Sequence, residues 1–124
     1  MTEIRNEYFP LKNETDEIIG IGIDIHKQLG FGFLEIVYKD AFEYELTKSN
    51  ILFQREKEYK INYKEIILPH KFYADFIVFD SVILEVKAKE GIADEDMAQT
   101  IKLLEMFRLQ SWIDLKFRKD EVRH

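Results

Sequence analysis

Three charged residues stand between apolar neighbours in the stretch "FYADFIVFDSVILEVKAKE", which begins at Phe72. They are Asp75, Glu85 and Lys87. Burying a charged side chain is costly unless an opposite charge or hydrogen bonds replace the lost water. Two acids that lie close together take up a proton or hold a cation between them. What these groups can do therefore depends on whether the chain brings them together.

The alternation of apolar residues in this stretch predicts a β-hairpin and its register. Both halves carry apolar residues at every second position, and the two sets share one face only if residues 79–81 form a three-residue loop. Asp75 then lies opposite Glu85, with Cβ atoms roughly 5 Å apart. Two carboxylates at that distance repel each other, so a proton, a divalent metal ion or Lys87 must compensate.

Two interpretations of this cluster follow from the residues. In the first, the charges form cross-strand salt bridges on a solvated face, because Glu-x-Lys on a strand is a common pattern. In the second, the charges form a partly buried site, because Ile77 and Ile83 share their face and predict that a helix covers it. We prefer the second interpretation, since partly buried acids beside a lysine are typical of functional sites.

Apolar residues at helical spacing predict three helices around this hairpin. The first spans about residues 15–29, where Gly20 and Gly22 favour close packing against a neighbouring element. The second spans about residues 34–48, and the third lies within residues 93–110. The main apolar stripe predicted for the second helix comprises Leu34, Val37, Ala41 and Tyr44.

Strands account for most of the remaining sequence. Residues 53–63 alternate as a half-exposed strand does, and a turn at Lys64 and Glu65 leads into a short returning strand. Residues 111–117 predict a last strand, in which Ile113, Leu115 and Phe117 alternate with Trp112, Asp114 and Lys116. The resulting order α-α-β-β-β-β-α-β predicts a single mixed α/β domain over residues 1–124, with residues 1–13 as a loose leader.

Composition narrows the functional classes. The chain has 124 residues, of which 46% are hydrophobic, and it contains no cysteine, which excludes disulfides and cysteine-based zinc sites. It has no apolar run approaching the ~20 residues of a membrane span and no signal-peptide layout, so we expect a soluble cytoplasmic protein without a membrane partner. The net charge of −6 differs from the basic footprint of most nucleic-acid binders.

The basic residues are densest between positions 55 and 71. Two interpretations of this run remain open: it holds a nucleic-acid backbone near the hairpin, or it is an ordinary solvated strand. Interleaved acids favour the second. The basic residues are Arg55, Lys57, Lys60, Lys64 and Lys71, and the acids are Glu56, Glu58 and Glu65.

Four motifs in order resemble a known superfamily. They are "GFLEIVY" at residues 32–38, Asp75, the Glu-x-Lys at residues 85–87, and "AQTIKLLE" at residues 98–105. Together they are similar to the PD-(D/E)XK nuclease superfamily and, more narrowly, to its GxxExxY protein family. The resemblance covers about residues 16–105 and implies a restriction-endonuclease-like core, with a mixed β-sheet flanked by helices.

The resemblance also implies a metal site. Asp75 and Glu85 would be ligands of Mg²⁺ or Mn²⁺, with the backbone carbonyl of Val86 as a third ligand. Lys87 would position or activate the attacking water, and Glu35 would reach the metal or its waters. Magnesium suits this set because it keeps several waters and needs only one or two protein carboxylates.

Two further residues receive roles. Gln99 matches the superfamily's glutamine on the helix after the hairpin, where it helps to orient the lysine or the substrate. Tyr38 lies on the same helix flank as Glu35, so it either contacts substrate or packs over the sheet, and packing is the preferred interpretation. The last strand departs from the family, whose Gly-rich pattern is replaced here by "SWIDLKFR".

The leading hypothesis is therefore a metal-dependent nuclease that hydrolyses phosphodiester bonds, with DNA and RNA both open as the nucleic-acid partner. Two alternatives are a non-catalytic binding or regulatory module that retains the fold, and a metal-dependent hydrolase of a small phosphate ester. The acidic net charge favours the alternatives, and the complete set of two acids and a lysine favours the nuclease. A homodimer would supply the binding surface that so small a chain lacks.

Overall fold

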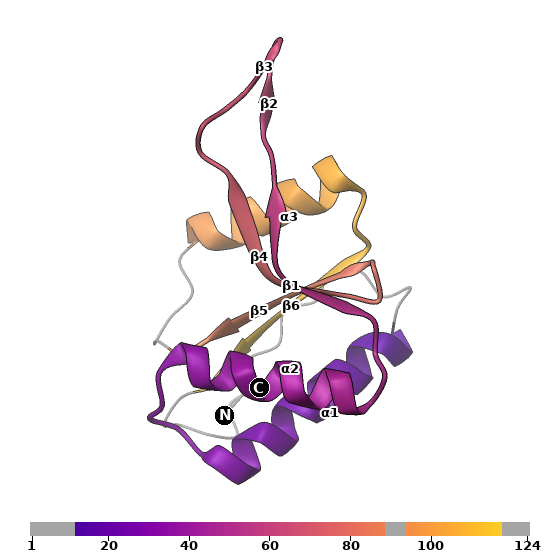
Figure 1. Ribbon diagram of the computed structural model, residues 1–124, viewed down its shortest axis with the longest axis vertical. Coiled ribbons are helices and arrows are strands. Elements are labelled where there is room, and N and C mark those ends of the chain that lie inside the picture. The colour runs from indigo at the N-terminus through magenta and orange to yellow at the C-terminus, as the bar shows by residue number, and fades with distance from the viewer. Residues whose placement is uncertain (1–11, 89–93, 118–124) are drawn as a thin grey trace.

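The structure is a computed structural model that describes residues 12–88 and 94–117, with only the backbone described for residues 94–97 (Figure 1). Three helices and six strands make up this part of the chain. In order they are α1 (Lys12–Leu29), α2 (Glu35–Lys48), β1 (Phe53–Tyr59), β2 (Asn62–Tyr63), β3 (Ile66–Ile67), β4 (Phe72–Val78), β5 (Val82–Lys87), α3 (Asp94–Phe107) and β6 (Ser111–Lys116).

Four of the strands form a mixed sheet in the order β1-β4-β5-β6. β1 pairs with β4 and β4 with β5 in antiparallel fashion, whereas β5 and β6 are parallel and joined through α3. The predicted mixed α/β architecture is confirmed. The predicted order differs in one respect, because the strand expected over residues 53–63 is divided into β1 and β2, which pair with different partners.

Helices cover both faces of the sheet (Figure 1). On one face, α1 and α2 bury a large apolar core against alternate residues of β4, β5 and β6. On the other face, α3 packs with Leu103 and Leu104 against Ile77, Ile83 and Trp112. The helical cover that Ile77 and Ile83 predicted over the charged face is therefore α3.

The stripe predicted for α2 is wrong at two of its four positions, since Val37 and Ala41 are half-buried but Leu34 and Tyr44 are exposed. Leu34 precedes the helix and is 76% exposed, and Tyr44 is 62% exposed. The buried residues are instead Tyr38, Phe42 and Leu46. Apolar side chains stand on more than one side of this helix, and the large rings face inward because they meet aromatic partners, with Tyr38 stacked on Phe117 at 4.3 Å between ring centroids.

The two helical glycines have different surroundings. A Cβ atom added at Gly22 would lie 2.7 Å from Leu115 Cδ1 and 3.3 Å from Phe42 Cζ, whereas one added at Gly20 would meet nothing within 4 Å. The close packing predicted for this pair is therefore confirmed at Gly22 alone. α1 begins at Lys12, so the last two residues of the predicted leader are helical, and residues 1–11 lie outside the described part of the chain.

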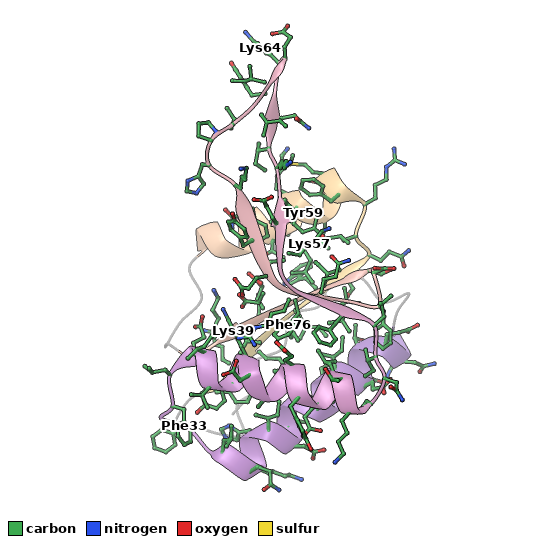
Figure 2. All side chains as sticks on the ribbon, viewed as in Figure 1. Phe33, Lys39, Lys57, Tyr59, Lys64 and Phe76 are labelled. Atoms are coloured by element: carbon green, nitrogen blue, oxygen red, sulfur yellow. The ribbon has the colours of Figure 1, made fainter. Side chains whose placement is uncertain are left out.

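A narrow β-ribbon projects beyond the body of the molecule (Figure 1). We call residues Lys60–Lys71 the arm; β2 and β3 form its outer part, and Lys64 and Glu65 form the turn predicted between them. Lys64 adopts φ +53° at this turn and stands at the tip (Figure 2). Within the described residues, no helix is long and apolar enough to cross a membrane.

Candidate functional site

The hairpin that carries the three charges has the predicted register. Val78 pairs with Val82, Ile77 with Ile83 and Phe76 with Leu84. Residues 79–81 form the loop, which Ser81 closes by donating its N–H to the carbonyl of Val78 at 3.1 Å. The next positions along the two strands are Asp75 and Glu85, and this register sets them opposite each other.

At Asp75 and Glu85, carboxylate oxygens replace backbone carbonyls as the hydrogen-bond acceptors between the two strands. The Asp75 N–H donates to Glu85 Oε2 at 2.8 Å, and the Val86 N–H donates to Asp75 Oδ2 at 2.8 Å. Both acids are buried, with 7% and 9% of their surface exposed. Reciprocal hydrogen bonds of this kind fix the orientation of both carboxylates before any ligand binds.

The pairing of β4 with β1 is interrupted at the same residue. Arg55 pairs with Phe76 and Lys57 with Ala74, but the intervening Glu56 has left the ladder and adopts φ +53°. A non-glycine residue in this conformation costs roughly 1–3 kcal/mol, and such strain clusters at functional sites. Asp75 therefore lies where the pairing of β4 with both neighbouring strands is interrupted.

Lys39 is the cation nearest to Asp75 among the ion pairs of the described residues. Its Nζ lies 2.8 Å from Asp75 Oδ1, 3.7 Å from Glu35 Oε2 and 3.6 Å from Glu56 Oε2, and 14% of its side chain is exposed. Burial lowers the pKa of Lys39, but the hydrogen bond to Asp75 and the charges of the three acids outweigh burial, so its pKa is raised and the lysine stays charged. Figure 2 shows Lys39 reaching from α2 toward the sheet.

Lys39 was not among the site residues predicted from the sequence. The available signal was its spacing of four residues from Glu35 on one helix, which brings the two side chains together. Glu35 itself accepts a hydrogen bond from the Ala88 N–H at 3.2 Å, at the end of β5. Glu35 thus contacts the site through Lys39 and the strand end.

The electrostatics of the site centre on Glu85. The pKa of Glu85 is raised to about 8, chiefly by burial and also by the charges of Asp75 and Asp114. The hydrogen bond from the Asp75 N–H and the charge of Lys87 act in the opposite direction. At neutral pH this carboxyl is mainly protonated, as predicted for one of two facing acids. A divalent cation bound here would displace that proton.

A pocket of about 180 Å³ opens beside the two acids, between the sheet and α3. Four of the predicted site residues line it, namely Asp75, Glu85, Lys87 and Gln99. The other lining residues are Phe72, Tyr73, Thr100 and Asp114. Val86 contributes its N–H to Asp75, and Glu35 lies on the α2 side.

Tyr38 lies outside this pocket and is completely buried. Its hydroxyl donates to the Gly30 carbonyl at 2.7 Å and accepts from the Phe33 N–H at 3.3 Å. These contacts hold the loop between α1 and α2. The observed placement is the packing role preferred in the sequence analysis, and it leaves no exposed surface for contact with a substrate.

Two residues of the last strand were likewise not predicted as part of the site. Asp114 and Lys116 alternate with the apolar residues of β6, but both are buried, with 5% and 1% of their surface exposed. The parallel register sets Asp114 beside Glu85 and Lys116 beside Lys87. The acidic and basic positions of β5 are therefore repeated on β6, and Asp114 adds a third acid to the pocket wall.

The carboxylates of the pocket suit a divalent ion that keeps most of its water ligands, rather than one surrounded entirely by protein ligands. The described residues contain no group of three His, Cys, Asp or Glu side chains arranged to hold a metal. Asp75 and Glu85 do supply two fixed carboxylates, and Mg²⁺ completes its shell largely with water. Lys39 occupies Asp75 Oδ1 in this structure, so a metal would share or take that oxygen.

A protein-family model matches the chain. The model of the family described as the PD-(D/E)XK nuclease superfamily matches residues 12–124. No curated protein and no solved structure matches the chain. The matched range contains the pocket, Lys39 and the whole of the described sheet.

Proposed function

The chain belongs to the PD-(D/E)XK nuclease superfamily, and from that membership and the pocket geometry we propose that it is a metal-dependent nuclease. Its mixed sheet flanked by helices is consistent with the restriction-endonuclease-like fold of that superfamily. The observation that carries the proposal is the pair Asp75 and Glu85, buried, mutually oriented by hydrogen bonds, and beside Lys87 in one pocket. The narrower assignment to the GxxExxY family rests on "GFLEIVY" and is part of the proposal.

Asp75 and Glu85 would hold Mg²⁺ or Mn²⁺, with the Val86 carbonyl as the proposed third ligand. A bound ion of this kind lowers the pKa of a water and neutralises charge on a phosphate. Lys87 lines the same pocket and would hold the attacking water by donating to its oxygen, which favours the hydroxide form. Gln99 faces the acids from α3 and would orient Lys87 or the substrate.

The elements around the acids support this chemistry by limiting motion. The backbone N–H groups of Asp75 and Val86 fix one oxygen of each carboxylate. Lys39 compensates the charge of Asp75 and links it to Glu35. Preorganised groups of this kind need little rearrangement during the reaction, which is the main source of electrostatic catalysis.

One observation favours a second function. Lys39 already neutralises Asp75 without a metal, which is what a non-catalytic binding module that retains the fold would need. The two functions differ in their response to divalent ions. A nuclease binds Mg²⁺ or Mn²⁺ through Asp75, whereas the module is indifferent to both.

A cleavage assay separates these functions. Plasmid, single-stranded and branched DNA and RNA are incubated with the protein in Mg²⁺ and then in Mn²⁺ at low salt. Asp75→Ala/Glu85→Ala is the test variant, and Glu17→Ala/Asp24→Ala, which removes two exposed acids of α1, is the matched control. We expect cleavage by the wild type and the control alone.

The remaining outcomes assign the alternatives. No cleavage by any variant, together with no metal-induced rise in melting temperature, supports the binding module. Metal binding with hydrolysis of nucleotides or simple phosphate esters only supports the small-substrate hydrolase. Equal cleavage by the Asp75→Ala/Glu85→Ala variant contradicts the assigned site.

A further inference from the structure

The arm takes no part in the core or in the pocket described above. The whole ribbon from Asn62 to Ile67 is exposed, and three of its exposed side chains are large and apolar. Tyr63, Ile66 and Ile67 are 55%, 56% and 51% exposed. An isolated two-stranded ribbon is at best marginally stable in water, and exposed apolar side chains gathered at one place mark an interaction surface.

The charge of the arm is opposite to that of the chain. Residues 60–71 contain three lysines and one glutamate, a formal charge of +2, whereas the whole chain carries −6. Lys64 stands at the tip with its Nζ 5.5 Å from the centre of the Tyr63 ring. Lys71 lies at the base, 3.9 Å from Glu58. The arm is thus a basic extension of an acidic body and complements a polyanion.

The arm leads directly into the wall of the pocket. β4 begins at Phe72, immediately after Lys71, and both Phe72 and Tyr73 line the pocket. Lys71 precedes Asp75 by four positions, and along an extended strand their Cα atoms are roughly 13 Å apart. Lys71 is therefore within reach of a polymer that has one phosphate at Asp75.

We propose that the arm binds double-stranded DNA by entering its major groove. The groove of B-form DNA is about 12 Å wide and admits a two-stranded β-ribbon, whereas the major groove of A-form RNA is too narrow and deep. Lys60, Lys64 and Lys71 contact flanking phosphates. Tyr63 and Ile66, which pair across the ribbon and so share one of its faces, face the base edges. The inference deepens the proposed nuclease function, on which it rests for the position of the cleaved strand.

A second copy of the chain fits the arm less well. β2 and β3 contain two residues each, so the ribbon offers few backbone groups for pairing with another arm. Lysines of two arms brought side by side would also repel each other. Charge complementarity and the continuity with the pocket both favour DNA.

Fluorescence anisotropy tests the proposal without cleavage. The wild type is titrated into a labelled duplex of about 20 bp, roughly two helical turns, in EDTA at several salt concentrations. The test variant is Lys60→Gln/Lys64→Gln/Lys71→Gln. The control, Lys12→Gln/Lys27→Gln/Lys48→Gln, makes the same charge change on α1 and α2, at the end of the molecule away from the arm (Figure 1).

We expect the arm variant to bind at least about tenfold more weakly and its salt slope to fall by about 2.7, since each phosphate contact contributes ~0.9. The control stays within about twofold of the wild type, because non-contacting lysines add only long-range attraction. Tyr63→Ser/Ile66→Ser, which keeps the charge and alters one face of the ribbon, weakens DNA binding by about tenfold if these side chains reach base edges. Circular dichroism confirms that each variant is folded.

Several outcomes overturn the proposal. The first two are an equal loss of DNA affinity in the arm and control variants, and no binding of the DNA duplex by the wild type. The others are equal affinity of the wild type for an RNA duplex of the same sequence, and a wild-type dimer that the arm substitutions convert to monomers. Failure of the nuclease assay does not affect this measurement, because DNA binding in the presence of EDTA requires no cleavage. Conversely, an active nuclease whose duplex binding ignores the arm overturns this inference alone.

Discussion

The two faces of the sheet differ although the same hairpin builds both. On the α1 and α2 face, alternate residues of β4 and β5 are apolar and fully enclosed, and even one glycine is needed for the close approach of α1. On the α3 face, the intervening residues place two acids and a lysine around a pocket. Stability is concentrated on the first face, and the second carries groups that cost stability. Substitutions on the two faces should therefore act in opposite ways.

The largest effect is expected on the enclosed face. Phe42→Ala removes a completely buried ring that contacts Phe76 and Phe117, and we expect a loss of about 3–5 kcal/mol in the free energy of unfolding. Urea denaturation measures the loss. Tyr44→Ala, on the exposed side of the same helix, should change stability by less than about 0.5 kcal/mol. Similar losses in both variants would contradict the assignment of the buried stripe.

A smaller effect is expected where the two faces meet. Lys39→Met leaves Asp75, Glu35 and Glu56 without their shared cation, and we expect a loss of about 1–3 kcal/mol, reduced from the fully buried case because the lysine is partly exposed. Mg²⁺ should restore part of this stability, so its effect on melting temperature should be larger in Lys39→Met than in the wild type. Lys27→Met, on the exposed surface of α1, is the control.

If Mg²⁺ raises the melting temperature of Lys39→Met and of the wild type equally, Lys39 and the metal do not share Asp75. That result would remove the reason for treating this lysine as part of the site. It would leave the ion pair as a purely structural contact between α2 and β4.

In the pocket, a substitution is expected to raise the free energy of unfolding rather than lower it. The pKa of Glu85 is raised from 4.5 to about 8, so the unfolded chain releases this proton at a lower pH than the folded chain. The free energy of unfolding should therefore fall as pH rises from about 4.5 to 8 and level off above it. Glu85→Gln, which cannot ionise and keeps an acceptor for the Asp75 N–H, should be more stable than the wild type by on the order of 1–2 kcal/mol at pH 8.

Thermal denaturation between pH 4 and pH 9 tests this prediction. The difference in stability between Glu85→Gln and the wild type should be near zero at the acid end and grow toward pH 8. A difference that does not change with pH would show that Glu85 is not protonated in the folded chain.

The smallest effect compares the two helical glycines. Gly20→Ala should stabilise α1 by up to ~1 kcal/mol through helix propensity, because its Cβ meets nothing. Gly22→Ala should instead lower stability by about 1 kcal/mol, because Leu115 and Phe42 must move to admit the new methyl group. Equal gains at both positions, measured by urea denaturation, would show that α1 packs less closely on the sheet than described.

Sequence reasoning succeeded where one short segment determines the structure. The register that sets Asp75 opposite Glu85 follows from alternation within the hairpin, because shifting it by one residue would expose every apolar side chain. Ile77 and Ile83 predicted a cover on the charged face for the same local reason. The placement of the two acids side by side on a covered face could thus be anticipated from about twenty consecutive residues.

It failed where two distant segments must meet. Lys39 reaches Asp75 only because α2 packs beside one particular position along β4. The periodicity of the helix does not contain this information. Asp114 and Lys116 look like the exposed positions of an alternating strand, and their burial follows from the parallel register with β5. In α2, two apolar stripes fit the helical period, and the aromatic partners on other elements decide which one is buried.

The break in backbone pairing at Asp75 also gives the molecule its own spectroscopic probe. The amide protons of Asp75 and Val86 are held by carboxylate oxygens rather than by strand carbonyls. Their ¹H–¹⁵N resonances should therefore move when Glu85 loses its proton or when a cation draws on either carboxylate, while the resonances of Ile77 and Ile83 in the regular ladder stay in place. Two backbone signals would thus report what occupies the pocket without any label being introduced.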